Sequence, residues 1–161
     1  IMISRTPKNI KSNTKKNLIE KLSLKTYQQA FFSSVEYAKY RSIYNDTELK
    51  NEQKYSVTLV SGIANSNHLI NHLKKQKINV KFIKFSDHHN YTVKDIKKIL
   101  SIYNKDKSTK KLILTTEKDA TKLREMTVHF NQQNVYYIPI QIIINEEGKF
   151  EKQILNYVKS N

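Results

Sequence analysis

The chain has 161 residues, a length suited to one well-packed domain and a second, smaller unit. It contains no cysteine, which excludes a disulfide framework, a zinc site built on thiolates and a cysteine nucleophile. Lys and Arg number 29 against 14 Asp and Glu, and the net charge of +15 favours polyanions such as nucleic acid, anionic lipid headgroups or phosphorylated substrates. The apolar runs are too short to cross a bilayer and no charged-then-apolar leader opens the chain, so we expect a soluble, intracellular protein.

Residues 1–44 predict a short region ahead of the main domain. The expected elements are a strand end at 1–3, a loop at 4–7, a helix at 13–24 capped by Asn13 or Thr14, and strands at 28–33 and 35–40. A domain rarely opens on the last turn of a buried strand, so we expect upstream sequence to be missing. Residues 45–54 are polar apart from Leu49 and are predicted to be the linker and domain boundary.

Residues 55–161 alternate between strands and helices. The expected elements are strands at 55–61, 78–85 and 111–115, helices at 68–77 and 92–104, a strand at 135–144 interrupted by Pro139, and a closing helix at 150–158. Such alternation implies right-handed crossovers and a mostly parallel sheet. The predicted fold is therefore α/β, a three-layer sandwich with a mostly parallel sheet.

The stretch FSDHHNYTVKD, residues 85–95, connects the end of a predicted strand to the start of a predicted helix. Open α/β sheets bind their ligands at the carboxyl ends of strands, and Asp87, His88 and His89 lie at such an end. A neutral histidine accepts a proton near pH 7, and a neighbouring carboxylate can fix its tautomer. The alternative is that Asp87 only caps the following helix and both histidines are solvated.

A second polar cluster, TTEKDATK at 115–122, also follows a strand. Thr116 and Asp119 have the spacing of a capping box, which would explain the start of a helix by itself. Glu117 and Lys118 are not required by a cap. Because parallel strand ends point the same way, residues 62–65, 87–89 and 115–119 should meet at one edge of the sheet and form a site or an interface.

Together these residues resemble a known family. The GIA turn at 62–64, FSDHHNY with its Thr and Asp helix start at 85–95, and LTTEKDATKL at 114–123 look like the C-terminal region of tetraacyldisaccharide 4'-kinase, the lipid A 4'-kinase. SRTP at 4–7 stands where that family has a TKCP-like loop, and QQAFFSSVEY at 28–37 resembles the segment leading to its interdomain linker. The resemblance covers essentially the whole chain.

The resemblance implies magnesium-dependent transfer of the ATP γ-phosphate to the 4'-hydroxyl of a tetraacyldisaccharide 1-phosphate, on the cytoplasmic side of the inner membrane, with an anionic membrane surface as a further partner. It places the phosphate-binding loop, the magnesium-binding acids and a catalytic aspartate in an N-terminal P-loop domain, of which residues 1–44 would be the end and the linker strands. The chain has only two glycines and no GxxxxGK[ST] motif. We therefore expect ATP and Mg²⁺ to be bound mainly by the missing half and this chain to be inactive alone.

The family's functional residues carry over as follows. His88 matches the histidine that pairs with the N-terminal catalytic aspartate, and Asp87 would orient it. The positions expected to shape the cleft facing the P-loop domain are Gly62, His89, Thr116, Glu117, Lys118 and Asp119. Arg5, in the loop on the nucleotide side, replaces the family's usual lysine, and Thr6 its cysteine. No metal ligand is predicted in this chain.

Two other classes remain open. A DHH-type phosphoesterase also binds metal with an Asp-His-His run, but it needs further aspartates on neighbouring strand ends and a glycine-rich histidine motif, which this chain lacks. A basic nucleic-acid-binding module is disfavoured because the lysines are scattered, arginines are few, and no RNA-binding aromatic signature or zinc-finger spacing occurs.

Overall fold

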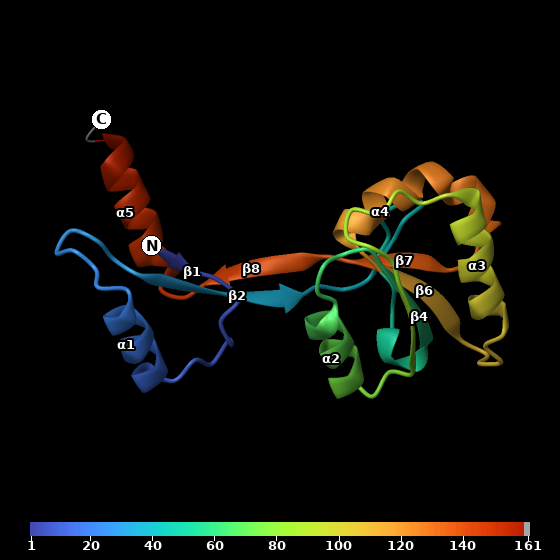
Figure 1. Ribbon diagram of the computed structural model, residues 1–161, viewed down its shortest axis with the longest axis horizontal. Coiled ribbons are helices and arrows are strands. Elements are labelled where there is room, and N and C mark those ends of the chain that lie inside the picture. Colours follow the sequence, from blue (N-terminus) through green and yellow to red (C-terminus); the bar gives the residue numbers. More distant parts are fainter. Residues whose placement is uncertain (160–161) are drawn as a thin grey trace. The chain divides into compact units, whose positions relative to one another are not determined.

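The structure, a computed structural model, describes residues 1–159 in two compact units. Unit 1 comprises Ile1–Tyr37 and the described residues from Ile140 onward, and unit 2 is Ala38–Pro139 (Figure 1). No helix among the described residues is long and apolar enough to cross a membrane.

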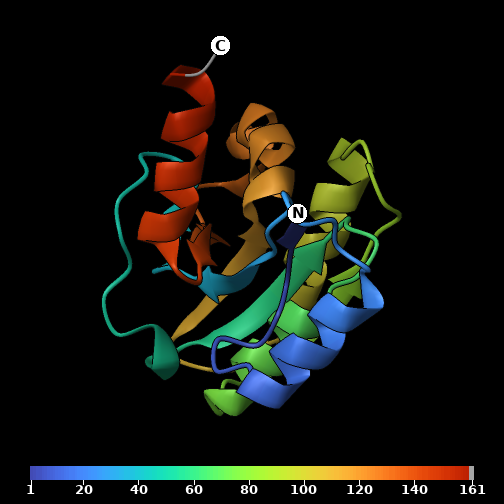
Figure 2. The same ribbon diagram turned by 90° about the vertical axis from the view of Figure 1, so that its left-hand side faces the viewer.

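Unit 1 is a three-stranded sheet with two helices. Its elements are β1 (Met2–Ile3), α1 (Ser12–Lys21), β2 (Phe31–Tyr37), β8 (Ile140–Ile144) and α5 (Glu147–Lys159). Strand β2 is central, pairing with β1 in parallel and with β8 antiparallel. Helices α1 and α5 lie on opposite sides of these strands (Figure 2), and Phe150 of α5 packs edge-on against Phe31.

Unit 2 is built on a five-stranded sheet of order β3-β7-β6-β4-β5. Its strands are β3 (Arg41–Ser42), β4 (Ser56–Ser61), β5 (Val80–Lys84), β6 (Lys111–Thr116) and β7 (Val135–Ile138). Its helices are α2 (Asn67–Lys75), α3 (Val93–Asn104) and α4 (Glu117–Leu123), with 3₁₀ turns η1 (Glu52–Lys54) and η2 (Arg124–Phe130). Strands β5, β4, β6 and β7 are parallel, and only β3 runs against its neighbour.

The sheet of unit 2 is covered on both faces. All six residues of β4 are buried, as expected of a central parallel strand. Figure 1 shows α2 on one side of the sheet and α3 and α4 on the other. The chain leaves β4 through α2 to reach β5, then crosses back over β4 through α3 to reach β6. This reversal around β4 is the kind of switch point at which open α/β sheets bind ligands.

The predicted mixed α/β fold with a mostly parallel sheet is confirmed. Local differences occur near the N-terminus. One strand, β2, replaces the two strands expected at 28–33 and 35–40. Helix α1 begins after Lys11, without a side-chain cap from Asn13 or Thr14.

The two units also differ from the division expected from the sequence. Residues 45–54 are not a linker between the units but part of unit 2, where the Asp46 carboxylate forms ion pairs with Arg41 and Arg124. Residues from Ile140 onward belong to unit 1, because β8 pairs with β2 over five residues.

Candidate functional site

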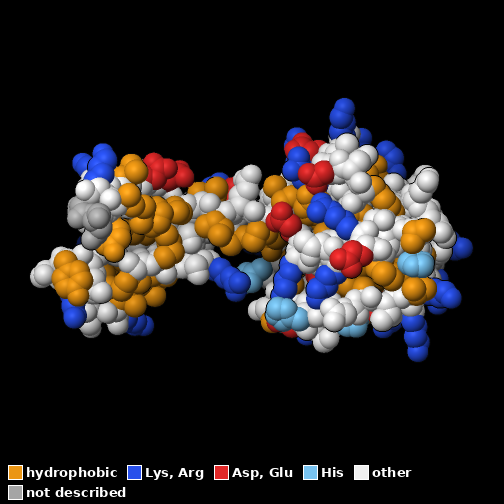
Figure 3. Space-filling view, turned by 90° about the horizontal axis from the view of Figure 1, so that it is seen from above, with side chains coloured by type: hydrophobic (Ala, Val, Ile, Leu, Met, Phe, Trp, Pro, Cys, Tyr) orange, Lys and Arg blue, Asp and Glu red, His pale blue; other side chains and the backbone are white. Residues whose placement is uncertain are grey.

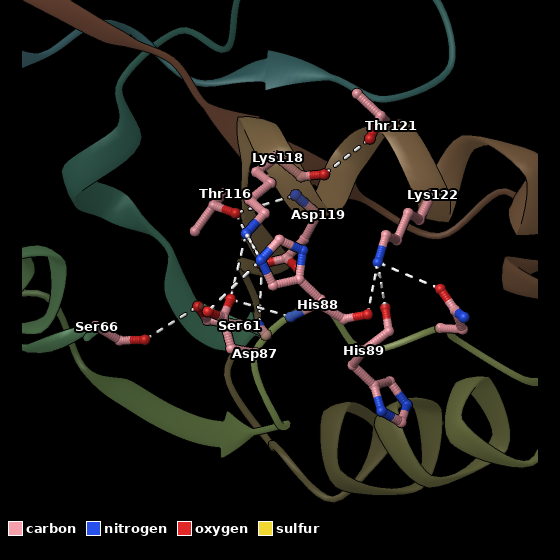
Figure 4. A network of polar contacts seen from close by, with 12 residues as sticks. Ser61, Ser66, Asp87, His88, His89, Thr116, Lys118, Asp119, Thr121 and Lys122 are labelled. Carbon is pink, nitrogen blue, oxygen red and sulfur yellow. Dashed lines mark hydrogen bonds and ion pairs between the residues drawn. The ribbon is translucent and has the colours of Figure 1, made fainter. Parts of the chain in front are cut away.

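Three loops meet at one edge of unit 2, at the carboxyl ends of β4, β5 and β6 (Figure 4). We call this edge the strand-end rim and define it as residues 61–66, 85–91 and 115–122. The sequence predicted that polar residues from these loops would meet, and the hydrogen bonds described below join all three. What the rim can do depends on which side chains it buries and which it exposes.

Asp119 is the buried junction of the rim, with 2% of its surface exposed. Its Oδ2 accepts a hydrogen bond from the Gly62 N–H at 3.0 Å and another from the Thr116 hydroxyl at 2.7 Å. The Thr116 hydroxyl in turn accepts the Asp119 N–H at 3.1 Å, so Thr116 caps α4 as its spacing indicated. The carboxylate also faces Tyr91, whose hydroxyl pKa is raised first by burial and then by the Asp119 charge. Asp119 therefore ties the loop after β4 to the start of α4.

Position 62 requires a glycine because neighbouring atoms of the rim lie too close to leave room for a side chain. A Cβ atom built on it would lie 3.0 Å from the Ser86 carbonyl oxygen, 3.1 Å from Asp119 Oδ1 and 3.4 Å from His89 Cβ. The Gly62 carbonyl oxygen accepts the His88 N–H at 3.2 Å. Gly62 thus connects the buried carboxylate of Asp119 to the backbone of the histidine loop.

His88 is the exposed histidine of the pair, with 75% of its side chain accessible. Its backbone is left-handed, with φ at 58°, a conformation uncommon for residues other than glycine. Its Nε2 lies 3.4 Å from Lys118 Nζ. An ammonium group only donates hydrogen bonds, so Nε2 is the acceptor in this contact.

Asp87 acts on this histidine differently from the expected carboxylate-to-ring contact. Its Oδ2 is 3.8 Å from His88 Nε2, beyond hydrogen-bond range, whereas its Oδ1 accepts the His88 backbone N–H at 3.0 Å. The same Oδ1 accepts a hydrogen bond from Lys118 Nζ at 3.2 Å, and this contact is the main reason that the Asp87 pKa is lowered. Asp87 therefore positions the His88 backbone and the Lys118 ammonium, not the imidazole directly.

His89 is turned inward and anchors the loop. Only a quarter of its side chain is exposed, its ring centroid is 4.6 Å from that of Phe85, and its Nε2 is 3.1 Å from Asp95 Oδ2. Asp95 belongs to the capping box with which Thr92 starts α3, so Thr92 and not Asp87 caps that helix. Burial raises the Asp95 pKa, but the hydrogen bonds from Thr92 and His89 outweigh it and the net pKa is lowered.

The remaining predicted residues are distributed as follows. Glu117 opens α4 and is exposed. Arg5 lies in unit 1, in a left-handed turn after β1, and its charge partly offsets the rise that burial causes in the Tyr37 pKa. From the sequence, no role was predicted for Lys122, although its ammonium group contacts three oxygens of the 88–90 loop. Its position four residues after Lys118, on the same face of α4, is the signal that could have identified it.

Among residues 1–159, no three His, Asp or Glu side chains gather in a way that could hold a metal ion. The charged or titratable side chains that the rim exposes include the His88 imidazole, the Lys118 ammonium group and the Asp87 carboxylate.

An open α/β sheet with polar loops gathered at its switch point is typical of α/β domains that bind ligands at this edge. Among solved structures, the chain resembles LpxK from Aquifex aeolicus, in the apo form crystal structure in complex with ATP, with a TM-score of 0.54 and 22% identity. The likeness covers 87% of this chain and 40% of that chain, and it shows a shared fold.

The family model described as tetraacyldisaccharide-1-P 4'-kinase matches residues 2–159. Curated relatives named tetraacyldisaccharide 4'-kinase include those of Bacteroides fragilis, 31% identical over 173 residues, and Flavobacterium psychrophilum, 33% identical over 165 residues. The chain belongs to this kinase family. The matches cover 100% of this chain but only 46% and 45% of these relatives, so the chain spans about half of their length.

Proposed function

We propose that this chain is the C-terminal part of a kinase that transfers the ATP γ-phosphate to the 4'-hydroxyl of tetraacyldisaccharide 1-phosphate in lipid A biosynthesis. The observation that carries the proposal is His88, an exposed imidazole with an acceptor nitrogen on the strand-end rim of a chain from this family. Phosphoryl transfer depends on positioned groups that orient the attacking hydroxyl and accept its proton.

Three side chains of the rim have separate roles in this reaction. His88 assists a base on the other half of the enzyme, either by receiving the hydroxyl proton at Nε2 or by holding that base in place. Lys118 lies 3.4 Å from the same nitrogen and supplies positive charge next to the transferred phosphoryl group. Asp87 holds Lys118 and the His88 backbone by hydrogen bonds of 3.2 and 3.0 Å. Gly62, His89, Thr116 and Asp119 support the loops from behind, and Glu117 extends the cleft face of α4.

ATP and Mg²⁺ belong, in this proposal, to the half of the enzyme outside the chain. The chain has two glycines and no phosphate-binding loop, and residues 1–159 gather no set of three metal-ligating side chains. These residues therefore do not fit a magnesium nucleotide, and we assign the chain no step through the metal. The isolated chain is accordingly expected to be inactive.

Unit 1 supports the proposal that a P-loop half packs against this chain. Its face in Figure 3 is largely hydrophobic, and the residues Ile142, Tyr157 and Val158 are 66–70% exposed. An apolar patch of this kind marks an interaction surface. Strand β1 is also an edge strand in a parallel pairing, an arrangement normally completed and covered within larger α/β sheets. We propose that unit 1, including Arg5 in its loop on the nucleotide side, completes the P-loop domain.

The proposed substrate is a lipid, so the proposed reaction takes place at a membrane. A tetraacylated lipid lies in a bilayer, and the net charge of +15 suits an anionic surface. We propose a cytoplasmic enzyme that works peripherally at the inner membrane.

The test is transfer of labelled phosphate from ATP to tetraacyldisaccharide 1-phosphate. The chain is joined to the P-loop half of a relative such as the Bacteroides fragilis kinase, and the two halves are also assayed separately. We expect phosphorylated lipid from the joined protein and none from either half alone. A joined protein that folds and binds ATP but phosphorylates no lipid would contradict the proposed reaction.

A further inference from the structure

Helix α4 presents two lysines, one turn apart, to the loop that carries the histidines (Figure 4). Lys118 contacts side chains of this loop, Asp87 and His88. Lys122 contacts its backbone: its Nζ donates to the carbonyl oxygens of His88 and His89, both at 2.8 Å. A third contact, at 3.3 Å, goes to the Asn90 side-chain oxygen. The two lysines therefore act on the loop in different ways.

The geometry around Lys122 uses every donor of its ammonium group. A lysine ammonium carries three N–H donors on one atom, and here three oxygens from consecutive residues converge on it. No ion pair between Lys122 and a carboxylate is formed among residues 1–159. Its charge instead strengthens hydrogen bonds to neutral oxygens, one of which, the His89 carbonyl, is partly buried. A neutral side chain of similar length cannot supply three donors at one point.

The loop needs such support because His88 is left-handed. A φ of 58° is unfavourable for a residue with a side chain and persists where the surroundings hold it. On the amide side, the His88 N–H is held by the Gly62 carbonyl at 3.2 Å and by Asp87 Oδ1 at 3.0 Å. On the carbonyl side, the hydrogen bond comes from Lys122.

We propose that Lys122 is a positioning residue that locks His88 in its left-handed conformation and so keeps the imidazole exposed on the rim. If the carbonyl of His88 were released, the loop could return to an ordinary negative φ, and the direction of the His88 side chain would change with it. The structural part of this proposal stands by itself, whereas its catalytic consequence rests on the proposed function.

The first experiment measures the His88 conformation in the 161-residue chain by NMR. A residue with φ near +60° gives a strong NOE between its own amide and Hα protons, because these protons are closest in that conformation. Lys122→Met removes the ammonium and retains an unbranched apolar side chain, Lys122→Arg retains charged donors, and Lys97→Met is the control on the exposed face of α3.

We expect a strong NOE at His88 in the wild type, in Lys122→Arg and in Lys97→Met, and a clearly weaker one in Lys122→Met. Lys122→Gln, which retains a donor group, is measured in the same way and serves if Lys122→Met does not fold; its NOE should also be weaker than that of the wild type. An unchanged NOE in the folded Met or Gln variant would overturn the proposal.

The second experiment measures kinase activity of the joined protein with the same substitutions. Misplacing a catalytic group costs about 10- to 100-fold in rate, so Lys122→Met should lower kcat by that factor while KM for ATP and lipid stays within about twofold. Lys122→Arg should restore most of kcat, and Lys97→Met should leave it unchanged. A weaker NOE with an unchanged kcat would overturn the catalytic role. If even the wild-type joined protein is inactive, the proposed function fails, and the NMR result still decides whether Lys122 locks His88.

Discussion

Gly62 offers the sharpest test of how the strand-end rim is built, because Gly62→Ala adds a single methyl group. That carbon would lie 3.0 Å from the Ser86 carbonyl oxygen, a backbone atom, and 3.1 Å from Asp119 Oδ1. The carboxylate cannot move aside freely, because its Oδ2 accepts hydrogen bonds from the Gly62 N–H at 3.0 Å and the Thr116 hydroxyl at 2.7 Å. Overpacking of this kind costs about 1–3 kcal/mol, and the stiffer unfolded chain returns roughly 0.4–1 kcal/mol. We expect a net loss of about 1 kcal/mol.

The assay is urea unfolding of the chain, followed through NMR amide signals of β4 and β6 so that the transition of unit 2 is read separately. With an m-value of about 1–3 kcal/mol/M, a loss of about 1 kcal/mol lowers the midpoint by roughly 0.5 M. Gly148→Ala is the control, since a Cβ at Gly148 meets nothing within 4 Å and Gly148 lies in α5 of unit 1, so the midpoint of unit 2 should not change. An unchanged midpoint for Gly62→Ala would refute the close-approach argument.

Two further predictions concern other parts of unit 2. Thr92→Ala removes the hydroxyl that caps α3. This hydroxyl accepts a hydrogen bond from the Asp95 N–H at 3.3 Å and donates one to the Asp95 carboxylate at 2.7 Å, so unit 2 should lose about 1 kcal/mol in the same urea assay. An unchanged midpoint would show that this cap contributes no stability. Asp106 is buried, and hydrogen bonds from Ser56 and Ser108 hold its pKa well below the ordinary value. Below about pH 4 the unfolded chain binds a proton at this residue that the folded chain does not, so its contribution to stability is lost as pH falls. Between about pH 4 and pH 2 the wild type should therefore lose more stability than Asp106→Asn, and equal acid sensitivity of the two proteins would contradict this reasoning.

The parallel sheet of unit 2 could be predicted because its central strands are covered on both faces. Such strands appear as short, mostly apolar runs, as in 57–60 and 112–114, and the helical periods between them indicate the α/β alternation. The cap at Thr116 was likewise visible, because capping depends on residues only three positions apart. The cap of α3 is Thr92 and not Asp87, the residue considered from the sequence.

The division into units could not be predicted from local patterns. Residues 140–144 are apolar enough for either sheet, and only their pairing with β2, such as Ser33 with Ile144, assigns them to unit 1. Residues 45–54 have the polar composition of a linker, yet Asp46 accepts a hydrogen bond from the Tyr137 hydroxyl and forms an ion pair with Arg124. Both contacts join residues far apart in the sequence, which composition does not reveal.

For the site, the sequence predicted which residues would meet but not what each would contact. By residue type alone the two adjacent histidines are equivalent, and only the family resemblance singled out His88. In the structure His88 has a left-handed φ and is exposed, whereas His89 packs against Phe85. The role of Lys122 depends on that same loop conformation, because its partners are mainly backbone carbonyls. Backbone partners leave no pattern of partner residues in the sequence, so only the spacing of four residues from Lys118 points to Lys122.

The most direct test of the central claim is the kcat of His88→Ala in the joined protein, compared with His129→Ala, an exposed histidine of η2 outside the rim. Losing a positioned acid-base group costs about 100-fold or more, so we predict a loss of that size for His88→Ala and an unchanged kcat for His129→Ala. Equal kcat values for His88→Ala and the wild type would contradict the catalytic assignment of the strand-end rim.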